Sequence, residues 1–297
     1  MSAYSKSGAS HLVKAIKNAD AVIVGAGAGL STAAGLTYSG QRFHEHFADF
    51  IDSYGFTDMY SAGFYPFESF EEQWAYWSRH IWYNRYIDTP KDTYDKLRKL
   101  LEDKDFFILT TNVDHRFQWA GFPKERLFYT QGDYGLWQCS KPCHDATYDN
   151  YEAVKRMVDK QRNMRIPSNL VPRCPKCGEP MSMNLRADST FVEDAGWHEA
   201  AARYGHFLTT HSTGKVLYLE LGVGMNTPSI VKYPFWHYTY TNLQAVYACI
   251  NYGEAYAPAQ IQNRSIVVDA DIDALLDEAL SIKLSAKPQE EEHGTAT

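Results

Sequence analysis

The stretch AVIVGAGAGLSTAAG, residues 21–35, decides the fold of this chain. Four apolar residues typical of a buried strand run into a glycine-rich turn, and the residues after the turn suit a helix. Glycines in such a turn let backbone N–H groups approach an anionic group such as a pyrophosphate. Leu30 occupies the last place of the pattern G-x-G-x-x-G, so the turn alone is a weak indication of a nucleotide site.

Apolar segments and helical patterns alternate along the rest of the chain. Further strands are predicted over residues 106–110, 215–222, 244–251 and 264–269. Helices are predicted to begin after Ser10 and after Thr89, each as an N-cap, and to cover residues 270–282. This alternation is typical of an α/β fold, a Rossmann-like parallel sheet with helices on both faces.

The composition is that of a globular, enzyme-sized protein. Its 297 residues are 44% hydrophobic, enough for one large core and a smaller satellite. With 29 basic and 36 acidic residues the formal net charge is −7, which argues against nucleic acid or a membrane surface as a partner. The apolar run from Ala21 follows Asp20 and is broken by glycines, so it fits neither a signal peptide nor a membrane span. We expect a soluble, cytoplasmic protein.

Two segments interrupt the alternation of strands and helices. Residues 43–86 are crowded with aromatic side chains and predict a helical insertion packed on the sheet. We interpret its aromatic stripe as core, with a ligand-binding box as the alternative. Residues 136–210 contain the second interruption, with cysteine pairs and a long insertion. The tail, residues 285–297, has little to bury and is predicted to be disordered.

Four of the five cysteines form two close pairs, Cys139 with Cys143 and Cys174 with Cys177. Two such pairs can clamp one ion, and four thiolates suit a closed, tetrahedral, structural zinc site. His144 in place of one cysteine is the alternative ligand set. The mildly basic residues between the pairs, 144–173, form either a solvated face or a surface that docks a partner.

The order of these motifs resembles that of the sirtuins, NAD-consuming protein deacylases and ADP-ribosyltransferases, over nearly the whole chain. The family's nucleotide-binding pattern G-A-G-x-S is matched by Gly27, Ala28, Gly29 and Ser31. Its pattern T-x-N-x-D followed by A-G is matched by Asn112, Asp114, Ala120 and Gly121. Its later cofactor contacts correspond to Gly222, Val223, Gly224, Asn251 and the turn at Asp271 and Ile272.

The resemblance implies that NAD binds between a large Rossmann-like domain and a small domain made of a zinc-binding module and a helical insertion. The large domain then comprises residues 1–42, 87–135 and 211–284. The insertion comprises residues 43–86, and the zinc-binding module comprises residues 136–210.

Three departures from the sirtuin pattern indicate which branch of that family the chain resembles. The arginine of P-D-F-R is missing from residues 37–40, which leaves Arg42 as its stand-in for cofactor binding. The peptide-binding pattern V-V-x-F-G-E becomes STFVED at residues 189–194, and the catalytic histidine of H-G becomes Gln131. These departures resemble the macrodomain-linked class M sirtuins, whose members are linked with mono-ADP-ribosylation of a lipoylated carrier protein related to the glycine-cleavage H protein.

The glutamine has a direct chemical consequence. An amide takes up no proton near neutral pH, so Gln131 cannot be the base that completes deacylation, although it can orient a ribose hydroxyl. Cleavage of the nicotinamide–ribose bond needs mainly positioning, which Asn112 and Asp114 can provide. Asp133 is then the expected base for an incoming nucleophile, or an exposed turn carboxylate with no role. His115 is the nearest replacement base in the sequence, although most such histidines only pack or face solvent.

The sequence therefore predicts an NAD-dependent protein mono-ADP-ribosyltransferase with little or no deacetylase activity. An unusual deacylase or NAD glycohydrolase is the first alternative, and a non-catalytic sensor of NAD or ADP-ribose is the second. The expected acceptor is a lipoylated carrier protein, and a macrodomain hydrolase is the expected functional partner.

Overall fold

The main sheet of the computed structural model is parallel throughout and has the strand order β3-β2-β1-β7-β8-β9. The structure describes residues 3–225 and 228–286. The six strands are β1 Ala21–Ala26, β2 Asp105–Thr110, β3 Leu127–Tyr129, β7 Val216–Leu221, β8 Val246–Asn251 and β9 Ser265–Asp269. Strand order reverses between β1 and β7, where an open parallel sheet binds its ligand. The predicted Rossmann-like sheet is confirmed.

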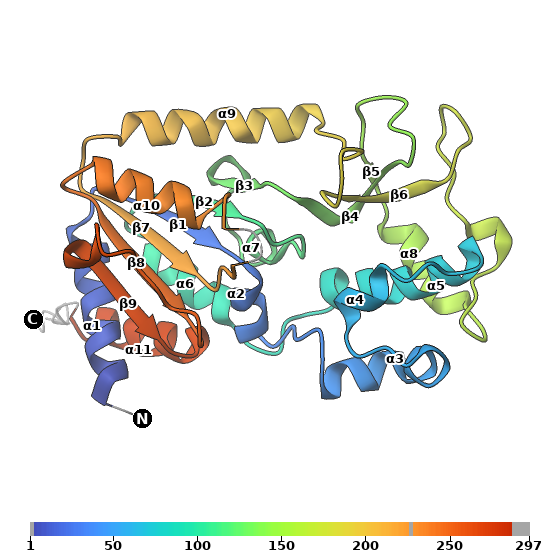
Figure 1. The fold of residues 1–297 in the computed structure, drawn as a ribbon, viewed down its shortest axis with the longest axis horizontal. Helices are drawn as coiled ribbons and strands as arrows, with labels where there is room; N and C mark the ends of the chain where they lie inside the picture. The colour runs from blue at the N-terminus through green and yellow to red at the C-terminus, as the bar shows by residue number, and fades with distance from the viewer. Residues whose placement is uncertain (1–2, 226–227, 287–297) are drawn as a thin grey trace, which may run out of the picture.

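Helices cover both faces of this sheet (Figure 1). Alternate strand residues point to opposite faces, so Val24 and Leu219 lie in one core cluster, while Ile23 and Tyr218 lie in another. The first cluster is closed by α1 Ala3–Asn18, α2 Ala28–Ala33, α6 Thr93–Leu101 and α11 Ile272–Ser285. The second is closed by α9 Ala195–Thr210 and α10 Lys232–Thr241. The central strands β1, β7 and β8 are therefore buried on both sides, as their sequences predict, whereas Val267 of the edge strand β9 is exposed.

The other end of the elongated molecule is a smaller lobe of helices and an antiparallel sheet of order β5-β4-β6 (Figure 1). Its strands are β4 Gly132–Cys139, β5 Tyr148–Asp149 and β6 Met181–Leu185. Its helices are α3 Gln41–Tyr54, α4 Met59–Gly63, α5 Phe70–Ile81, a π-helix Trp82–Tyr86 and α8 Tyr151–Lys160. Short turns of helix complete the fold: α7 Arg116–Trp119 and 3-10 turns at Lys124–Arg126, Ser168–Leu170 and Gln262–Arg264.

The aromatic side chains of residues 43–86 form the core of this smaller lobe. Phe47, Phe50 and Tyr76 are fully buried and pack on one another. Trp74 packs edge-on against Trp137 of β4, with ring centroids 4.9 Å apart. The prediction of a core stripe is confirmed. The expected packing on the main sheet is wrong, because the apolar face of α5 is covered by the small sheet and α8 instead.

Helix α9 packs on the main sheet and not in the zinc-binding module, to which the sequence analysis assigns it. Residues 195–210 were expected within the zinc-binding module, but Ala200 and Phe207 are buried with Phe107 against the main sheet. The helix runs back across the top of that sheet in Figure 1.

The predicted disordered tail begins inside α11, which extends to Ser285, and its residues 287–297 lie outside the described part of the chain. Among the described residues, no helix has the length and apolar character to cross a membrane.

Two predicted helix starts are wrong. Ser10 is exposed within α1, which already begins at Ala3. Thr89 is not an N-cap, because its hydroxyl donates to the carbonyl of Lys91 at 2.8 Å, and α6 begins at Thr93. Both residues have the chemistry of a cap, but Ser10 lies inside a longer helix and the hydroxyl of Thr89 bonds to a nearby carbonyl instead.

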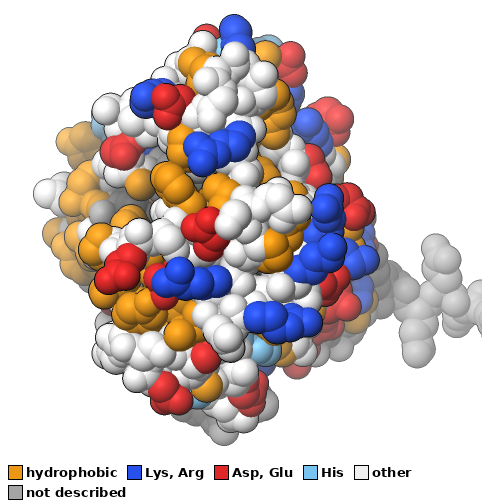
Figure 2. Space-filling view, turned by 90° about the vertical axis from the view of Figure 1, so that its right-hand side faces the viewer, with side chains coloured by type: hydrophobic (Ala, Val, Ile, Leu, Met, Phe, Trp, Pro, Cys, Tyr) orange, Lys and Arg blue, Asp and Glu red, His pale blue; other side chains and the backbone are white. Residues whose placement is uncertain are grey.

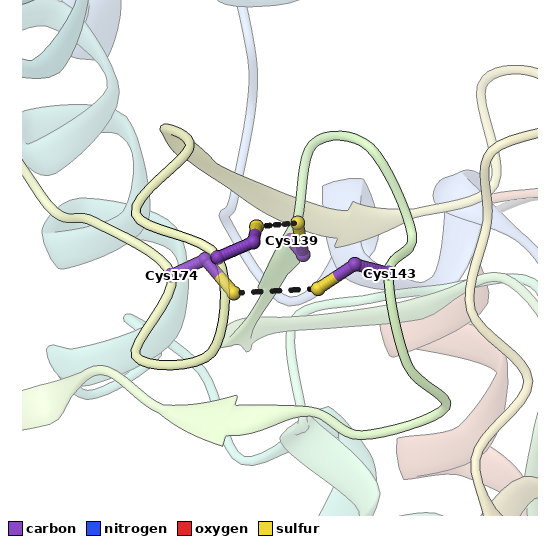
Figure 3. A group of neighbouring side chains, drawn as sticks. Cys139, Cys143 and Cys174 are labelled. Atoms are coloured by element: carbon purple, nitrogen blue, oxygen red, sulfur yellow. Dashed lines mark hydrogen bonds between the residues drawn. The ribbon is translucent and has the colours of Figure 1, made fainter.

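The two cysteine pairs meet in the small lobe, in the loops around β4 and β6 (Figure 3). The Sγ atoms of Cys139 and Cys177 are 3.5 Å apart, and those of Cys143 and Cys174 are 3.7 Å apart. All four sulfur atoms lie within 4.8 Å of one another. Zinc–sulfur bonds of about 2.3 Å in a tetrahedron require sulfur atoms about 3.8 Å apart, so the four thiolates fit one closed zinc site.

His144 is not part of this group. Its Nδ1 lies 3.0 Å from Sγ of Cys143, and its Nε2 is hydrogen-bonded to the hydroxyl of Tyr148 at 2.7 Å. The mutually close ligand atoms in the described residues belong to the four cysteines. The structure therefore favours the all-cysteine ligand set over the alternative with His144.

Elemental analysis of the purified protein is expected to find about one zinc per chain. Cys174→Ser is expected to lose the zinc and most of the soluble yield, because a closed metal site contributes directly to folding. Cys249→Ala, at the cysteine that lies outside the group, is the control and is expected to keep the zinc. A zinc-free wild-type protein of unchanged stability would contradict the assignment.

Candidate functional site

Two loops meet at the point where the strand order reverses. The glycine turn follows β1, and a second turn, residues 222–224, follows β7. The N–H of Gly27 donates to the carbonyl of Leu221 at 3.0 Å, and the N–H of Gly29 donates to the carbonyl of Gly222 at 2.9 Å. Ala28, between these two donors, is exposed. The N–H groups of Gly27 and Gly29 thus hold the second loop, and Ala28 is the open part of the turn.

This contact has room only for glycine. A Cβ on Gly29 would lie 2.7 Å from Cα of Gly222, and a Cβ on Gly27 would lie 2.7 Å from the carbonyl oxygen of Gly222. Gly222 itself has φ of 62°, a conformation that side chains with a Cβ rarely adopt. Gly27, Gly29 and Gly222 are therefore brought together, and each is required by the close approach of backbone to backbone.

Ser31 connects the glycine turn to the end of β2. The Asn112 side-chain amide donates to the carbonyl of Gly27 at 2.9 Å and to the hydroxyl of Ser31 at 3.1 Å. The hydroxyl of Ser31 donates to the carboxylate of Asp114 and lies 2.9 Å from the hydroxyl of Tyr94. Because Ser31 has one proton, and Asp114 receives it, Tyr94 is the donor in the second contact.

Burial sets the protonation of this cluster. Burial raises the pKa of the Asp114 carboxyl, and the hydrogen bond from Ser31 opposes this rise. Burial also raises the pKa of Tyr94 well above its ordinary value, so its hydroxyl keeps its proton at neutral pH. Tyr94 therefore donates to Ser31, which in turn donates to Asp114 and accepts from the amide of Asn112. The sequence patterns marked Ser31, Asn112 and Asp114, but nothing in them marked Tyr94.

Asp133 lies in a second polar cluster beside the first. One carboxylate oxygen accepts from Arg85 Nε at 2.8 Å and from the N–H of Gly135 at 2.7 Å. The other oxygen is bonded to Nδ1 of His115. Burial alone would raise the pKa of Asp133, but His115 and Arg85 hold the pKa below its ordinary value. Asp133 is therefore neither the exposed turn carboxylate of the alternative interpretation nor a ready proton acceptor.

The two clusters share one narrow crevice. Its lining includes the predicted catalytic residues Asn112, Asp114 and Asp133, and also His115 and Gly132. Gln131 is not among its lining residues. Arg85, which the sequence patterns did not mark, reaches this region from the π-helix in the small lobe. The crevice thus lies where the end of β2, the start of β4 and the small lobe meet.

Gln131 precedes a glycine that no other residue can replace. Gly132 has φ of 93°, and a Cβ there would lie 1.8 Å from the carbonyl oxygen of Asn184. The carbonyl of Gln131 accepts from the N–H of Arg186 at 3.0 Å. Within the described residues, the side-chain amide of Gln131 makes no hydrogen bond. Its backbone is therefore fixed while its amide is free to meet a ligand.

Arg42 is engaged by the protein itself. Its guanidinium donates to the carbonyl of Thr37 at 2.9 Å, to Asn84 Oδ1 at 2.9 Å and to the carbonyl of Tyr83. It lines a cleft of about 400 Å³ between the segment after α2 and the helical insertion. The predicted stand-in thus joins the cofactor-loop segment to the small lobe, and its guanidinium bonds to protein groups.

Three further residues were predicted to contact the cofactor, and the structure places them in different surroundings. Asn251 ends β8, and its amide donates to the carbonyl of Val223 at 3.1 Å. A Cβ added to Gly224 would meet no close neighbour, because the nearest atom, in the side chain of Glu254, lies 3.7 Å away. Ile272 is 2% exposed and belongs to the hydrophobic core cluster under α11. The side chain of Ile272 therefore packs in the core and is not exposed to a cofactor.

Sequence comparison identifies two informative relatives. The chain is 44% identical over 268 residues to a protein ADP-ribosyltransferase of Staphylococcus aureus strain Mu50, covering 90% of this chain and 85% of that protein. It is 36% identical over 230 residues to a probable bifunctional ADP-ribose hydrolase/ADP-ribosyltransferase of Fusarium oxysporum f. sp. cubense. This match covers 74% of the chain but 38% of the fungal protein. No protein-family model matches the chain.

Solved structures with the same fold are sirtuins. The structure of Sir2Tm bound to a propionylated peptide has a TM-score of 0.58 at 15% identity, covering 92% of this chain and 98% of that one. A Sir2–p53 peptide–NAD+ structure has a TM-score of 0.56 at 14% identity, covering 93% and 98%. These likenesses establish the fold, and the staphylococcal relative establishes the family. The chain belongs to the same family as the staphylococcal protein ADP-ribosyltransferase, and its fold is that of the sirtuins.

Proposed function

We propose that this protein transfers a single ADP-ribose from NAD to an acceptor protein and releases nicotinamide. The observation that carries the proposal is the cluster in which Asn112 and Asp114 are joined to Ser31 and the glycine turn. The amide at position 131 adds to it, because an amide is no base. NAD would lie along the carboxyl edge of the main sheet, across the contact of Gly29 with Gly222. The name of the staphylococcal relative supports the same activity.

Little or no deacetylase activity is expected from the same site. Deacylation by a sirtuin needs a base that frees a ribose hydroxyl in its second half, and the amide of Gln131 takes up no proton near neutral pH. The segment 189–194 is irregular and is held by Gln138, whose side chain accepts from the N–H of Val192 at 2.9 Å. Cleavage of the nicotinamide–ribose bond relies on positioning and charge stabilisation, which Asn112 and Asp114 would supply.

The acceptor is proposed to be a lipoylated carrier protein related to the glycine-cleavage H protein. A basic segment, residues 155–176, supports a protein acceptor with an acidic face. It holds seven Lys and Arg side chains, all exposed, and one acidic residue, Asp159, although the whole chain has a net charge of −7. None of the seven forms a salt bridge with another described residue. Figure 2 shows the end of the small lobe, where Lys and Arg side chains lie among hydrophobic and acidic ones.

A macrodomain hydrolase is proposed as the functional partner that removes the modification. The fungal relative carries both activities in its name, and this chain spans 38% of that protein, so the fungal chain has ample length for a second domain. A transferase and a hydrolase acting on the same ADP-ribose group would make the modification reversible.

With NAD and lipoylated carrier, wild-type protein is expected to add one ADP-ribose to the carrier, as measured by intact-mass spectrometry. Asn112→Ala is expected to slow transfer about tenfold to a thousandfold, because it removes the amide that ties the end of β2 to Gly27 and Ser31. The exposed Asn18→Ala is the control. The proposal fails if wild type leaves the carrier, lipoylated or not, unmodified and releases nicotinamide at the same rate without it.

Reversing charge in the basic segment is expected to weaken carrier recognition alone. Lys155→Glu with Arg156→Glu should raise KM for the carrier about tenfold and leave the affinity for NAD unchanged, since steering by surface charge acts on association. Lys14→Glu with Lys17→Glu, on exposed positions of α1 at the opposite end of the molecule, is the matched control. Equal KM values for both double variants would show that the basic segment is not part of the docking surface.

A further inference from the structure

His115 and Asp133 form a pair that the sequence patterns did not connect. His115 follows the Asn112–Asp114 motif and caps the start of α7, at the junction of the two lobes (Figure 1). Asp133 lies on β4, next to Gln131 and Gly132. Both residues line the crevice that also contains Asn112 and Asp114. The pair is therefore placed beside the groups that would hold the reacting ribose.

We propose that His115 is the general base of the transfer reaction and that Asp133 positions it. This proposal rests on the proposed function and assigns the proton transfer that Gln131 cannot perform. It changes the role expected for Asp133 from base to positioning residue. His115 would be the catalytic residue that contacts the incoming acceptor.

The carboxylate of Asp133 fixes the tautomer of the imidazole. One of its oxygens is already used by Arg85 Nε at 2.8 Å and by the N–H of Gly135 at 2.7 Å. These donors, together with the low pKa of the buried carboxyl, keep Asp133 ionised, so it can only accept from His115. In the neutral imidazole the proton of His115 therefore lies on Nδ1, which leaves Nε2 as the nitrogen that can act as a base.

The backbone holds His115 in a conformation that a histidine rarely adopts. Its φ is 65° and its ψ is 16°, in the left-handed region that favours glycine. The carbonyl of His115 accepts from the N–H of Trp119 at 3.2 Å, which closes the first turn of α7. The side chain of His115 is 25% exposed, whereas that of Asp133 is 5% exposed. The imidazole is thus accessible on one side and tied to a buried carboxylate on the other.

The proton balance of the step is simple. The bond from ribose C1′ to the nicotinamide nitrogen breaks, and nicotinamide leaves with the electron pair. A new bond forms between C1′ and the nucleophilic atom of the acceptor, whose proton passes to Nε2 of His115 and then to solvent. ADP-ribosylated acceptor, nicotinamide and one proton are the products, and no other reactant is needed.

His115→Gly tests the assignment without backbone strain, because glycine readily adopts a φ of 65°. Transfer to the lipoylated carrier is expected to fall about a hundredfold or more, which is the usual contribution of a general base, while the affinity for NAD stays the same. Added imidazole should restore transfer at least tenfold, since it can occupy the vacated space and take the proton. His115→Gln leaves no such space, so imidazole should not rescue it.

The exposed His206→Ala is the control, and its rate should be that of wild type with or without imidazole. The proposal is overturned if His115→Gly transfers at the wild-type rate, or if folded His115→Gly loses transfer and imidazole restores none of it. A wild-type protein that turns over no NAD, with or without carrier, would overturn the proposed function and this inference with it. Wild-type transfer with a fully active His115→Gly would overturn this inference alone.

Discussion

The close approach of two backbone turns at the reversal of strand order is the constraint on which the site depends. Gly29 meets Gly222 so closely that a single added Cβ would lie 2.7 Å from a backbone carbon. The contact brings the end of β1 against the end of β7 and leaves Ala28 open between them. Asn112 then joins the end of β2 to the same turn. The turns that follow three parallel strands, β1, β2 and β7, thus meet at one edge of the sheet.

Two buried carboxylates at this edge have pKa values shifted in opposite directions, and their surroundings explain the difference. Asp114 receives its side-chain hydrogen bond from the neutral hydroxyl of Ser31, so burial prevails and its pKa rises. Asp133 faces His115 and Arg85, which outweigh burial and lower its pKa. One carboxylate is thus held by neutral donors beside Asn112, and the other remains charged to orient an imidazole. Such separation between neighbouring carboxylates is typical of enzyme sites.

The sequence predicted those features that depend on a local pattern. Apolar runs between turns specified the strands, because the central strands β1, β7 and β8 are buried on both faces. Cysteine spacing specified the cluster at Cys174, because a metal site needs its donor types close together. The pairing of His115 with Asp133 could not be predicted, since it depends on how the chain passes from β3 of the main sheet into β4 of the small sheet. The burial of Ile272 depends on the packing of α11, and the cap expected at Thr89 is lost to a hydrogen bond with a neighbouring carbonyl.

Binding of NAD to Gly29→Ala measures the central constraint most directly. Calorimetric titration should find NAD binding to wild type and a loss of at least tenfold in affinity for Gly29→Ala, because the added Cβ forces the two turns apart. Gly205→Ala, on α9 with no atom within 4 Å of the new Cβ, should bind NAD as wild type does. If folded Gly29→Ala binds NAD as tightly as wild type, the two-turn contact does not form the cofactor site and the account is contradicted.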